Sequence, residues 1–331
     1  MRRREFITFL GGAAAGVLWP LDARAQQPAR VARIGYLGFG TAAAFASRVE
    51  ALRAGLRDLG YVEGKNIVID FRWAEGVDRL RELAAELVRE NVDVIFATSS
   101  TEVEVANQAT KTIPIVFATH FDPIGSGHVA SLARPGGNIT GFSVLLSEIT
   151  GKALQMLKDT VPHATKIGVL WTPTAPSHRP VLEQIEIAGA RLGVQLQLAS
   201  VRTVEEFEGA FATLAQHSVD AVFVHATSLT ARGRNAPLLL AELALQYRLP
   251  SMFGIRENVL AGGLMSYSSN ANDLTRQAAT YIDKILKGTK PADLPVQQAT
   301  RFELVLNMKT AKALGLTIPP SIMVQVNDVI E

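Results

Sequence analysis

Cysteine is absent from the 331-residue chain, and so are the common signatures of catalysis. Without cysteine there is no disulfide, no thiolate chemistry and no N-terminal cysteine that could carry a lipid anchor. The chain has no Gly-x-Ser-x-Gly elbow, no Walker loop and no pair of histidines at the spacing of metal ligands. We therefore expect no catalytic residue, no metal site and no cofactor, and predict that the protein is not an enzyme.

One glycine-containing stretch, at residues 35–40, superficially resembles a dinucleotide-binding loop. Its spacing differs from that of such a loop, and Asp70 is only near the position of the acidic residue that would bind the ribose. An exported, cofactor-dependent oxidoreductase therefore stays open as an alternative function of a different class.

The formal net charge of +2 originates in the first 25 residues, which hold four arginines and two acidic residues. The remaining chain has 29 basic and 29 acidic side chains, so it offers no basic field for nucleic acid. Hydrophobic residues make up 48% of the chain and charged residues 19%, so it can bury substantial cores. Its length suggests about two domains.

The same 25 residues have the features of a signal peptide in the expected order. An Arg-Arg pair at positions 3 and 4 is followed by an apolar stretch from Phe9 to Trp19, and an Ala-Arg-Ala cleavage site ends at Ala25. The apolar stretch is too short for a permanent membrane anchor. An amphipathic N-terminal helix of the fold is the alternative. We expect cleavage of this twin-arginine-type signal after Ala25 and a periplasmic protein that is not lipid-anchored.

Residues 93–123 are typical of two parallel strands joined by a helix, with a polar turn after each strand. Four hydroxyl residues (98–101) follow the first strand, and the polar cluster 119–122 follows the second. Ligands of open α/β sheets bind beyond the carboxyl ends of the strands, where helix N-termini offer free N–H groups. The two turns therefore predict half of a small-ligand site, unless the hydroxyls only cap a helix.

The pattern of strands and helices occurs twice. Residues 166–170 repeat 33–37, Gly193 repeats the helix end at Gly60, and 220–228 repeat 93–99. Each copy is a β-α-β-α-β unit of roughly seventy residues, so the simplest account is two similar doubly wound lobes. The predicted strands are 32–37, 66–71, 94–96, 113–117, 166–170, 194–200, 249–253, 263–267 and 302–307, and the predicted helices are 44–59, 77–89, 102–110, 180–192, 204–216, 272–286 and 308–314.

The C-terminal third is expected to be shared between the lobes. Crossings near residues 143, 268 and 300 would give an N-terminal lobe of 31–143 plus 268–300 and a C-terminal lobe of 144–267 plus 301–331. The predicted fold class is α/β, with two Rossmann-like lobes joined by a three-crossing hinge. A hinge between lobes places the ligand in the cleft.

Polar and aromatic residues at the strand ends of both lobes are the candidate ligand contacts. Hydroxyls and helix N-terminal amides suit a carboxylate, an acidic side chain suits an ammonium, and aromatic rings supply apolar walls, so the ligand is predicted to be a small zwitterion. Asp122 could instead only form a turn, Trp171 be core and Glu257 be solvated. The candidates are Phe39, Thr41, Ser99, Ser100, Thr101, Thr119, His120, Asp122, Trp171, Thr172, Thr227, Ser228, Glu257 and Tyr267.

Three stretches resemble a known family: 113–143 (IPIVFATHFDPIGSGHVASLARPGGNITGFS), 262–270 (GGLMSYSSN) and 284–323 (KILKGTKPADLPVQQATRFELVLNMKTAKALGLTIPPSIM). They are similar to the substrate-binding components of ABC transporters in the TrpX-like, tryptophan-binding group. The resemblance covers essentially the whole mature chain and implies a periplasmic-binding-protein type I fold. Known members bind aromatic amino acids, which implies that Ser99, Ser100, Thr101 and the turn 119–122 line the site. The chain differs from lipoprotein relatives in lacking the anchoring cysteine.

We therefore predict a periplasmic solute-binding protein of an ABC importer. It is expected to bind an amino acid, which the resemblance implies to be aromatic, or a small organic anion in the interlobe cleft. Ligand contacts from both lobes would stabilise the closed state, which a permease of the inner membrane then recognises. A monomer with no nucleic-acid partner is expected, and an orphan receptor that signals to a sensor is a further alternative.

Overall fold

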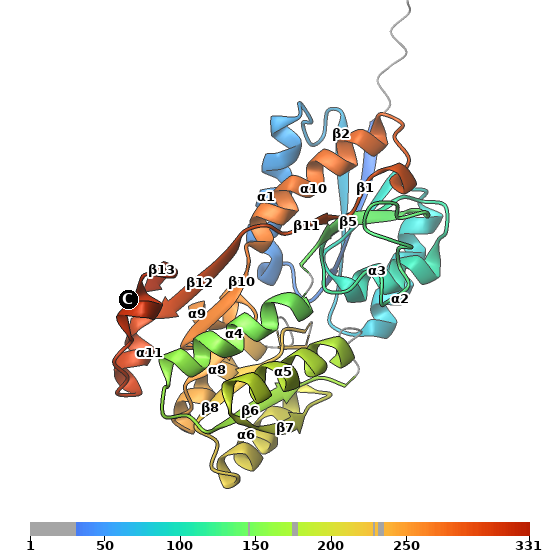
Figure 1. Cartoon of the computed structure of the whole chain (residues 1–331). Helices are drawn as coiled ribbons and strands as arrows, with labels where there is room; N and C mark the ends of the chain where they lie inside the picture. Colours follow the sequence, from blue (N-terminus) through green and yellow to red (C-terminus); the bar gives the residue numbers. More distant parts are fainter. Residues whose placement is uncertain (1–30, 145, 174–177, 228, 231–234) are drawn as a thin grey trace, which may run out of the picture. The chain divides into compact units, whose positions relative to one another are not determined.

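The computed structural model describes residues 31–144, 146–173, 178–227, 229–230 and 235–331, drawn as a ribbon in Figure 1. The predicted signal peptide at 1–25 and the predicted site residue Ser228 lie outside the described residues. The strands form two sheets, and each sheet has helices on both of its faces (Figure 1).

The first sheet has six strands in the order β2-β1-β3-β4-β5-β11, and all neighbouring strands in it are parallel. Strands covered on both faces consist of continuous apolar runs, and the whole of β3 is accordingly buried. Its strands are β1 (Ala32–Phe39), β2 (Ile67–Ala74), β3 (Val94–Ala97), β4 (Ile115–His120), β5 (Ile139–Ser143) and β11 (Gln297–Gln298), and the helices beside it are η1 (Ala43–Phe45), α1 (Ala46–Asp58), α2 (Val77–Arg89), α3 (Ser100–Ala109), α10 (Ala271–Leu286) and η3 (Pro291–Asp293).

The second sheet has seven strands in the order β7-β6-β8-β9-β10-β12-β13. Neighbouring strands in this sheet are parallel, except for β10 and β12, which are antiparallel. The first five strands follow the same order as in the first sheet, as expected from the repeat. Its strands are β6 (Lys166–Trp171), β7 (Gln195–Ser200), β8 (Ala221–Val224), β9 (Ser251–Phe253), β10 (Met265–Ser269), β12 (Phe302–Asn307) and β13 (Val326–Ile330), and its helices are α4 (Leu146–Thr160), α5 (His178–Leu192), η2 (Val204–Glu206), α6 (Phe207–Gln216), α8 (Ala236–Gln246), α9 (Arg256–Leu260), α11 (Met308–Ala313) and α12 (Pro320–Met323).

Buried apolar side chains form a cluster on each face of each sheet. Successive residues of a strand point to opposite faces, so Tyr36 joins the cluster beneath α1 and α10, whereas Leu37 joins that beneath α2 and α3. The equivalent residues of the second copy, Val169 and Leu170, divide in the same way between the clusters beneath α4 and α5 and beneath α6 and α8. The repeat in the sequence is thus a repeat of both core layers.

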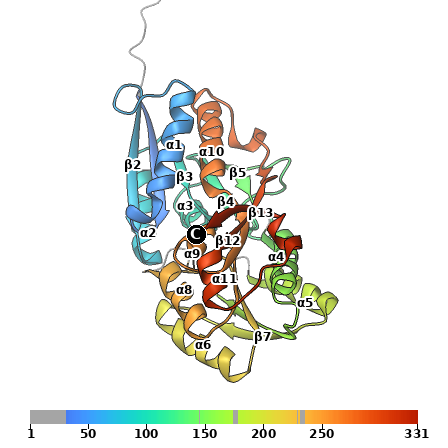
Figure 2. The same ribbon diagram turned by 90° about the vertical axis from the view of Figure 1, so that its left-hand side faces the viewer.

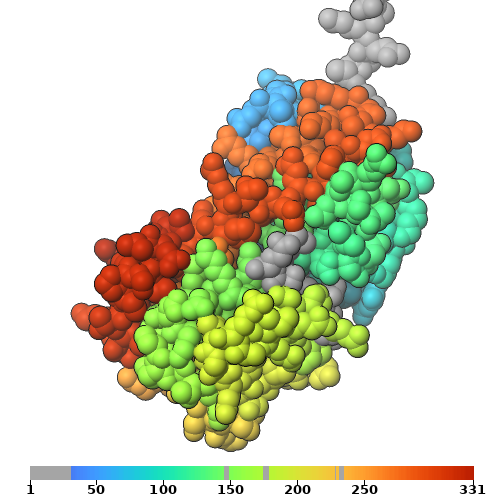
Figure 3. All heavy atoms as spheres, viewed as in Figure 1, coloured from blue at the N-terminus to red at the C-terminus, as the bar shows by residue number. Residues whose placement is uncertain are grey.

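Helix α10 lies beside α1 although more than 200 residues separate them in the chain (Figures 1 and 2). Their close approach depends on Gly55, where a Cβ atom would lie 2.4 Å from the carbonyl oxygen of Arg276. At the surface, Arg276 binds Asp58 with 2.6 Å between Nη2 and Oδ2. The surface of the two helices is continuous in Figure 3, where α1 is blue and α10 orange. A late segment thereby completes the first lobe.

The chain passes between the two sheets three times, after β5, after β10 and after β11. The prediction of two doubly wound lobes joined by three connections is confirmed. The residue boundaries predicted for the lobes stay a prediction. Several elements were not predicted, namely α4, α8, α9, α12, β5, β11 and β13. Within the described residues, no helix combines the length and apolar character needed to cross a membrane.

Candidate functional site

A pocket of about 780 Å³, part of it open to solvent, is lined by side chains of both lobes. The first lobe contributes α1 and the end of β4, and the second contributes the ends of β8, β9 and β10 and the start of α9. Carboxyl ends of parallel strands are the usual position of ligands in such sheets. We call it the interlobe pocket, and its lining residues are Arg48, Thr119, Phe121, Val144, Ile149, Thr227, Gly254, Ile255, Arg256, Glu257, Ser268, Ser269, Asn270, Ala271, Asn272 and Glu303.

Arg48 is the buried cation of this pocket. It lies on α1 with 8% of its side chain exposed, and its Nη2 is 3.0 Å from Oε1 of Glu257 on α9. Its guanidinium also lies 5.7 Å from the ring centroid of the buried Phe45. A buried charge requires a partner of opposite sign, and here the partner comes from the other lobe.

A second group of charges forms the wall of the pocket beside the connection to α10. Arg256 binds Asp328 of β13, and its Nη1 is 4.0 Å from Oε2 of Glu303. The same carboxylate accepts a hydrogen bond of 3.2 Å from Nδ2 of Asn270, the N-cap residue of α10. The pocket therefore presents both positive and negative groups, which suits a zwitterionic ligand.

Glu102, in the first turn of α3 in the first lobe, is fully buried. Its carboxylate accepts hydrogen bonds from the hydroxyls of Thr98 and Ser99. The backbone N–H of Phe39 also donates to it, at 3.0 Å. Ser99 precedes α3 as its N-cap residue, but its hydroxyl accepts no backbone hydrogen bond there. The hydroxyls after β3 thus stabilise a buried carboxylate rather than simply capping a helix.

The end of β4 is held by a chain of side chains that begins at Ser100. Its Oγ is 3.3 Å from Nδ1 of His120, whose Nε2 is 2.7 Å from Nδ1 of His128. Nε2 of His128 then lies 2.6 Å from Oε2 of Glu104. Burial, together with the nearby His128, holds the pKa of His120 well below its ordinary value of 6.5. His120 is therefore neutral, and it fixes the turn that presents Thr119 and Phe121.

In the second lobe, three buried threonines lie beyond the ends of two neighbouring strands, Thr172 after β6 and Thr227 and Thr230 after β8. The hydroxyl oxygen of Thr227 lies 3.4 Å from that of Thr172 and 3.2 Å from that of Thr230. Thr230 donates a hydrogen bond of 2.8 Å to the carbonyl oxygen of His225. This network fixes Thr227, which is part of the pocket lining.

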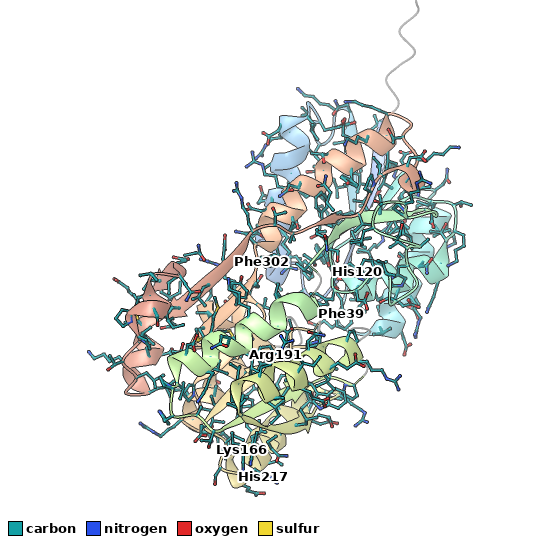
Figure 4. All side chains as sticks on the ribbon, viewed as in Figure 1. Phe39, His120, Lys166, Arg191, His217 and Phe302 are labelled. Carbon is teal, nitrogen blue, oxygen red and sulfur yellow. The ribbon has the colours of Figure 1, made fainter. Side chains whose placement is uncertain are left out.

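Of the residues predicted from the sequence, Thr119, Thr227 and Glu257 line the interlobe pocket together. Tyr267 lines a neighbouring pocket instead. The remaining assignments as ligand contacts stay predictions. Ser99, Ser100, His120 and Thr172 are buried beside or beneath the pocket, Phe39 and Trp171 are partly buried at the ends of β1 and β6 (Figure 4 labels Phe39 and His120), and Thr101 lies in the first turn of α3.

Two predicted residues make turn contacts. Oδ1 of Asp122 accepts a hydrogen bond of 2.8 Å from the N–H of Gly125, as in the turn proposed as the alternative. Oγ1 of Thr41 accepts a bond of 3.3 Å from the N–H of Ala44 at an exposed position. These contacts give both side chains a structural role in their loops.

Four lining residues were not predicted from the sequence, namely Arg48, Arg256, Asn270 and Glu303. Arg48 lies in an amphipathic helix, where an arginine is usually solvated, so no local pattern distinguishes it. Arg256 lies three residues after the end of β9, and its position beyond the end of a strand was the available signal. Within the part of the chain that the structure describes, no three acidic or histidine side chains form a group that could hold a metal ion.

Comparison with known proteins gave consistent matches. The family model described as ABC transporter substrate binding protein matches residues 40–330. A tyrosine-binding protein of Clostridioides difficile (strain R20291) is 28% identical over 262 residues, which are 79% of this chain and 74% of that protein.

Two solved structures are similar over nearly the whole chain. A conserved domain protein from Vibrio cholerae is 27% identical with a TM-score of 0.85, and the match covers 91% of this chain and 100% of that one. An ABC domain from Streptococcus pneumoniae, solved in complex with L-Trp, is 25% identical with a TM-score of 0.83, covering 90% of this chain and 99% of that one.

Proposed function

Because this chain belongs to the family of ABC transporter substrate binding proteins, we propose that it binds an aromatic amino acid in the interlobe pocket. The family and the fold, which matches that of periplasmic binding proteins, already define the general role. The protein binds a small molecule on the extracytoplasmic side and works with a membrane permease. What the proposal adds is the chemical class of the ligand and the side chains that recognise it.

The ion pair between Arg48 and Glu257 is the observation that carries the proposal. The two charges lie in one pocket but on different lobes, at 3.0 Å from each other. An amino acid carries the same two charges, so its carboxylate can bind Arg48 while its ammonium binds Glu257 or Glu303. A ligand held in this way contacts both lobes, and only such contacts can favour closure.

The apolar part of the pocket supports an aromatic side chain on the ligand. Phe121, Ile149 and Ile255 line the pocket beside the charged groups. A flat ring can lie against such residues while the charged end reaches Arg48. The two relatives that carry a ligand in their names bind tyrosine and tryptophan, which are ligands of this chemistry.

The test is calorimetric titration of the purified protein with L-tyrosine, L-tryptophan, L-alanine and D-glucose. We expect binding of the aromatic amino acids and at least a tenfold loss of affinity in Arg48→Met, because a charge-assisted hydrogen bond is removed. Arg57→Met is the matched control on the same helix, and Arg57 is exposed and outside the interlobe pocket. Unchanged affinity in Arg48→Met, or binding of glucose alone, would overturn the proposal.

We also propose that the protein acts as a periplasmic monomer without catalytic activity, after cleavage of the signal peptide behind Ala25. The order of arginine pair, apolar stretch and Ala-Arg-Ala site supports the cleavage. Mass spectrometry of the protein from the periplasm should give a first residue of Gln26. Light scattering of the same sample should give the mass of one chain.

A further inference from the structure

A second pocket, which adjoins the interlobe pocket through Val144 and Ile149, is lined in part by the antiparallel pair β10 and β12. In this pair Ser268 is opposite Glu303, and both line the interlobe pocket. Tyr267 and Phe302 are the preceding residues of the two strands, and alternation along a strand turns them to the opposite face. There they line a pocket of about 670 Å³, part of it open to solvent, which we call the hinge pocket.

Two of the three connections between the lobes, and the strand β10 that precedes the third, take part in the hinge pocket. Val144 directly follows β5, Tyr267 lies two residues before the end of β10, and Thr300 lies between β11 and β12. The ring of Tyr267 also packs against that of Phe302, with 5.9 Å between centroids (Figure 4 labels Phe302). A molecule in this pocket would therefore contact two of the segments that connect the lobes.

The charge in the hinge pocket comes from Lys152 on α4. Its Nζ lies 5.0 Å from the ring centroid of Tyr267. Among the residues that the structure describes, no oxygen is within hydrogen-bonding or ion-pairing distance of this ammonium. Lys152 is exposed to solvent, whereas Lys287, for example, lies 2.8 Å from Asp283. The three donors of Lys152 are thus available to an anion.

The residues that line the hinge pocket also indicate which ligands it does not favour. Apart from Lys152 its described lining is apolar, aromatic or neutral, and it includes no carboxylate. An ammonium group of a ligand would find no counter-charge there, in contrast to the interlobe pocket with Glu257 and Glu303. A carboxylate on a flat aromatic body matches one cation beside two rings.

We propose that the hinge pocket is a second ligand site, specific for a small aromatic carboxylate that lacks an amino group. Its carboxylate binds the ammonium of Lys152, and its ring lies against Phe302 and Val144. The site differs from the amino-acid site in its charged residues, although the two pockets adjoin and share Val144 and Ile149.

The experiment is a titration of the protein, expressed from its full sequence, with 4-hydroxyphenylacetate, monitored by calorimetry. We expect binding to the wild type and a loss of at least tenfold in affinity in Lys152→Met, which keeps the length of the side chain but removes its charge. The matched control is Lys284→Met. Lys284 also places its ammonium over a tyrosine ring, 5.5 Å from the centroid of Tyr281, but lines neither pocket.

Arg48→Met separates the two sites. If the probe occupies the hinge pocket, Arg48→Met binds it as the wild type does, whereas Lys152→Met does not. A probe whose affinity is lost in Arg48→Met and kept in Lys152→Met is bound in the interlobe pocket, and this result would overturn the hinge site. Absence of binding to the wild type at millimolar concentrations would overturn it as well. Equal melting temperatures of the variants establish that each is folded.

Discussion

At the scale of single residues, the hydrogen bonds of His120 determine which of its ring nitrogens carries the proton. The backbone N–H of Asp122 donates to Nδ1 at 3.2 Å, so Nδ1 is an acceptor. Nε2 must then carry the hydrogen and donate it to Nδ1 of His128, at 2.7 Å. His128 in turn donates from Nε2 to Glu104. Protonation of His120 at Nδ1 would break its bond to Asp122.

His120 is therefore predicted to make the protein less stable in acid. Burial and the proximity of His128 hold the pKa of His120 well below 6.5 in the folded state. Below about pH 6.5 the unfolded chain gains a proton there that the folded chain does not bind, so stability falls as the pH falls. One such proton contributes at most about 1.4 kcal/mol per pH unit to the slope.

Urea unfolding of the wild type and of His120→Gln between pH 7 and pH 5 measures this contribution. The glutamine should flatten the dependence of the unfolding free energy on pH. His217→Gln, at an exposed position on the end of α6, serves as the control and should keep the slope of the wild type. If the unfolding free energy of His120→Gln depended on pH as steeply as that of the wild type, His120 would not be the source of the acid sensitivity.

The sequence predicted which segments carry the site better than it predicted which side chains face the ligand. His120 and Thr119 are adjacent at the end of one strand, yet Thr119 lines the interlobe pocket and His120 lies beneath it. Pleating decides this difference, and the exact register of a strand end is not visible in a single sequence. Glu102 was missed for another reason, because Ser99 and Glu102 have the spacing of a capping box.

At the scale of elements, the spacing of apolar residues in the sequence predicted the helices that are amphipathic. Helix α2 has the predicted bounds of 77–89, because Leu80, Leu83 and Leu87 recur on one face with charges opposite. Helix α8 (Ala236–Gln246) was not predicted, since apolar residues surround most of it and leave no such contrast. The late strand β12 was predicted, but its antiparallel pairing with β10 depends on residues that are distant in the chain.

The pairing of β4 and β5 depends on a single glycine. Gly141 lies opposite Phe117 and has φ of +152°, a value that other residues rarely adopt. A Cβ atom at this position would be 2.1 Å from the carbonyl oxygen of Phe117. The strand β5 leads into the first connection between the lobes, so a change here would disturb both the sheet and the hinge.

Gly141→Ala is accordingly expected to lower the free energy of unfolding by about 2 kcal/mol or more, through backbone strain and the clash with Phe117. Gly137→Ala is the matched control, because a Cβ atom there meets no atom within 4 Å and Gly137 has no positive φ. The control should change stability by no more than about 0.5 kcal/mol. Denaturant unfolding of both variants gives the comparison, and similar values for the two would show that β5 can adapt.

At the scale of the whole molecule, the internal repeat predicted the architecture. Both sheets have the same order over their first five strands, and the chain passes between them three times. What the repeat could not predict is the contact between the copies. Arg48 and Glu257 are separated by 209 residues and belong to helices that have no special local signal. The chemistry of the interlobe pocket arises from assembly of the two lobes, and only the structure places these charges together.

The charges of Arg48 and Glu257 are predicted to act together on ligand binding. If the ligand's carboxylate and ammonium are recognised by Arg48 and Glu257, then Arg48→Met and Glu257→Gln should each weaken L-tyrosine binding by about tenfold or more. The two losses should not multiply in the double variant, because each substitution also removes the partner of the other charge. Leaving either charge without its partner is itself costly at a site as buried as that of Arg48.

Calorimetric titrations of the four proteins complete this double-mutant cycle. The ion pair of Arg53 and Glu63, with 2.8 Å between Nε and Oε2, provides a control cycle outside the interlobe pocket, and its arginine lies on the same helix as Arg48. Its variants Arg53→Met and Glu63→Gln should leave the affinity for L-tyrosine as it is in the wild type. Fully multiplicative losses for Arg48 and Glu257 would mean that the two side chains act on the ligand separately. The ion pair between the lobes would then have no part in recognition, because coupling between its members is what a shared ligand requires.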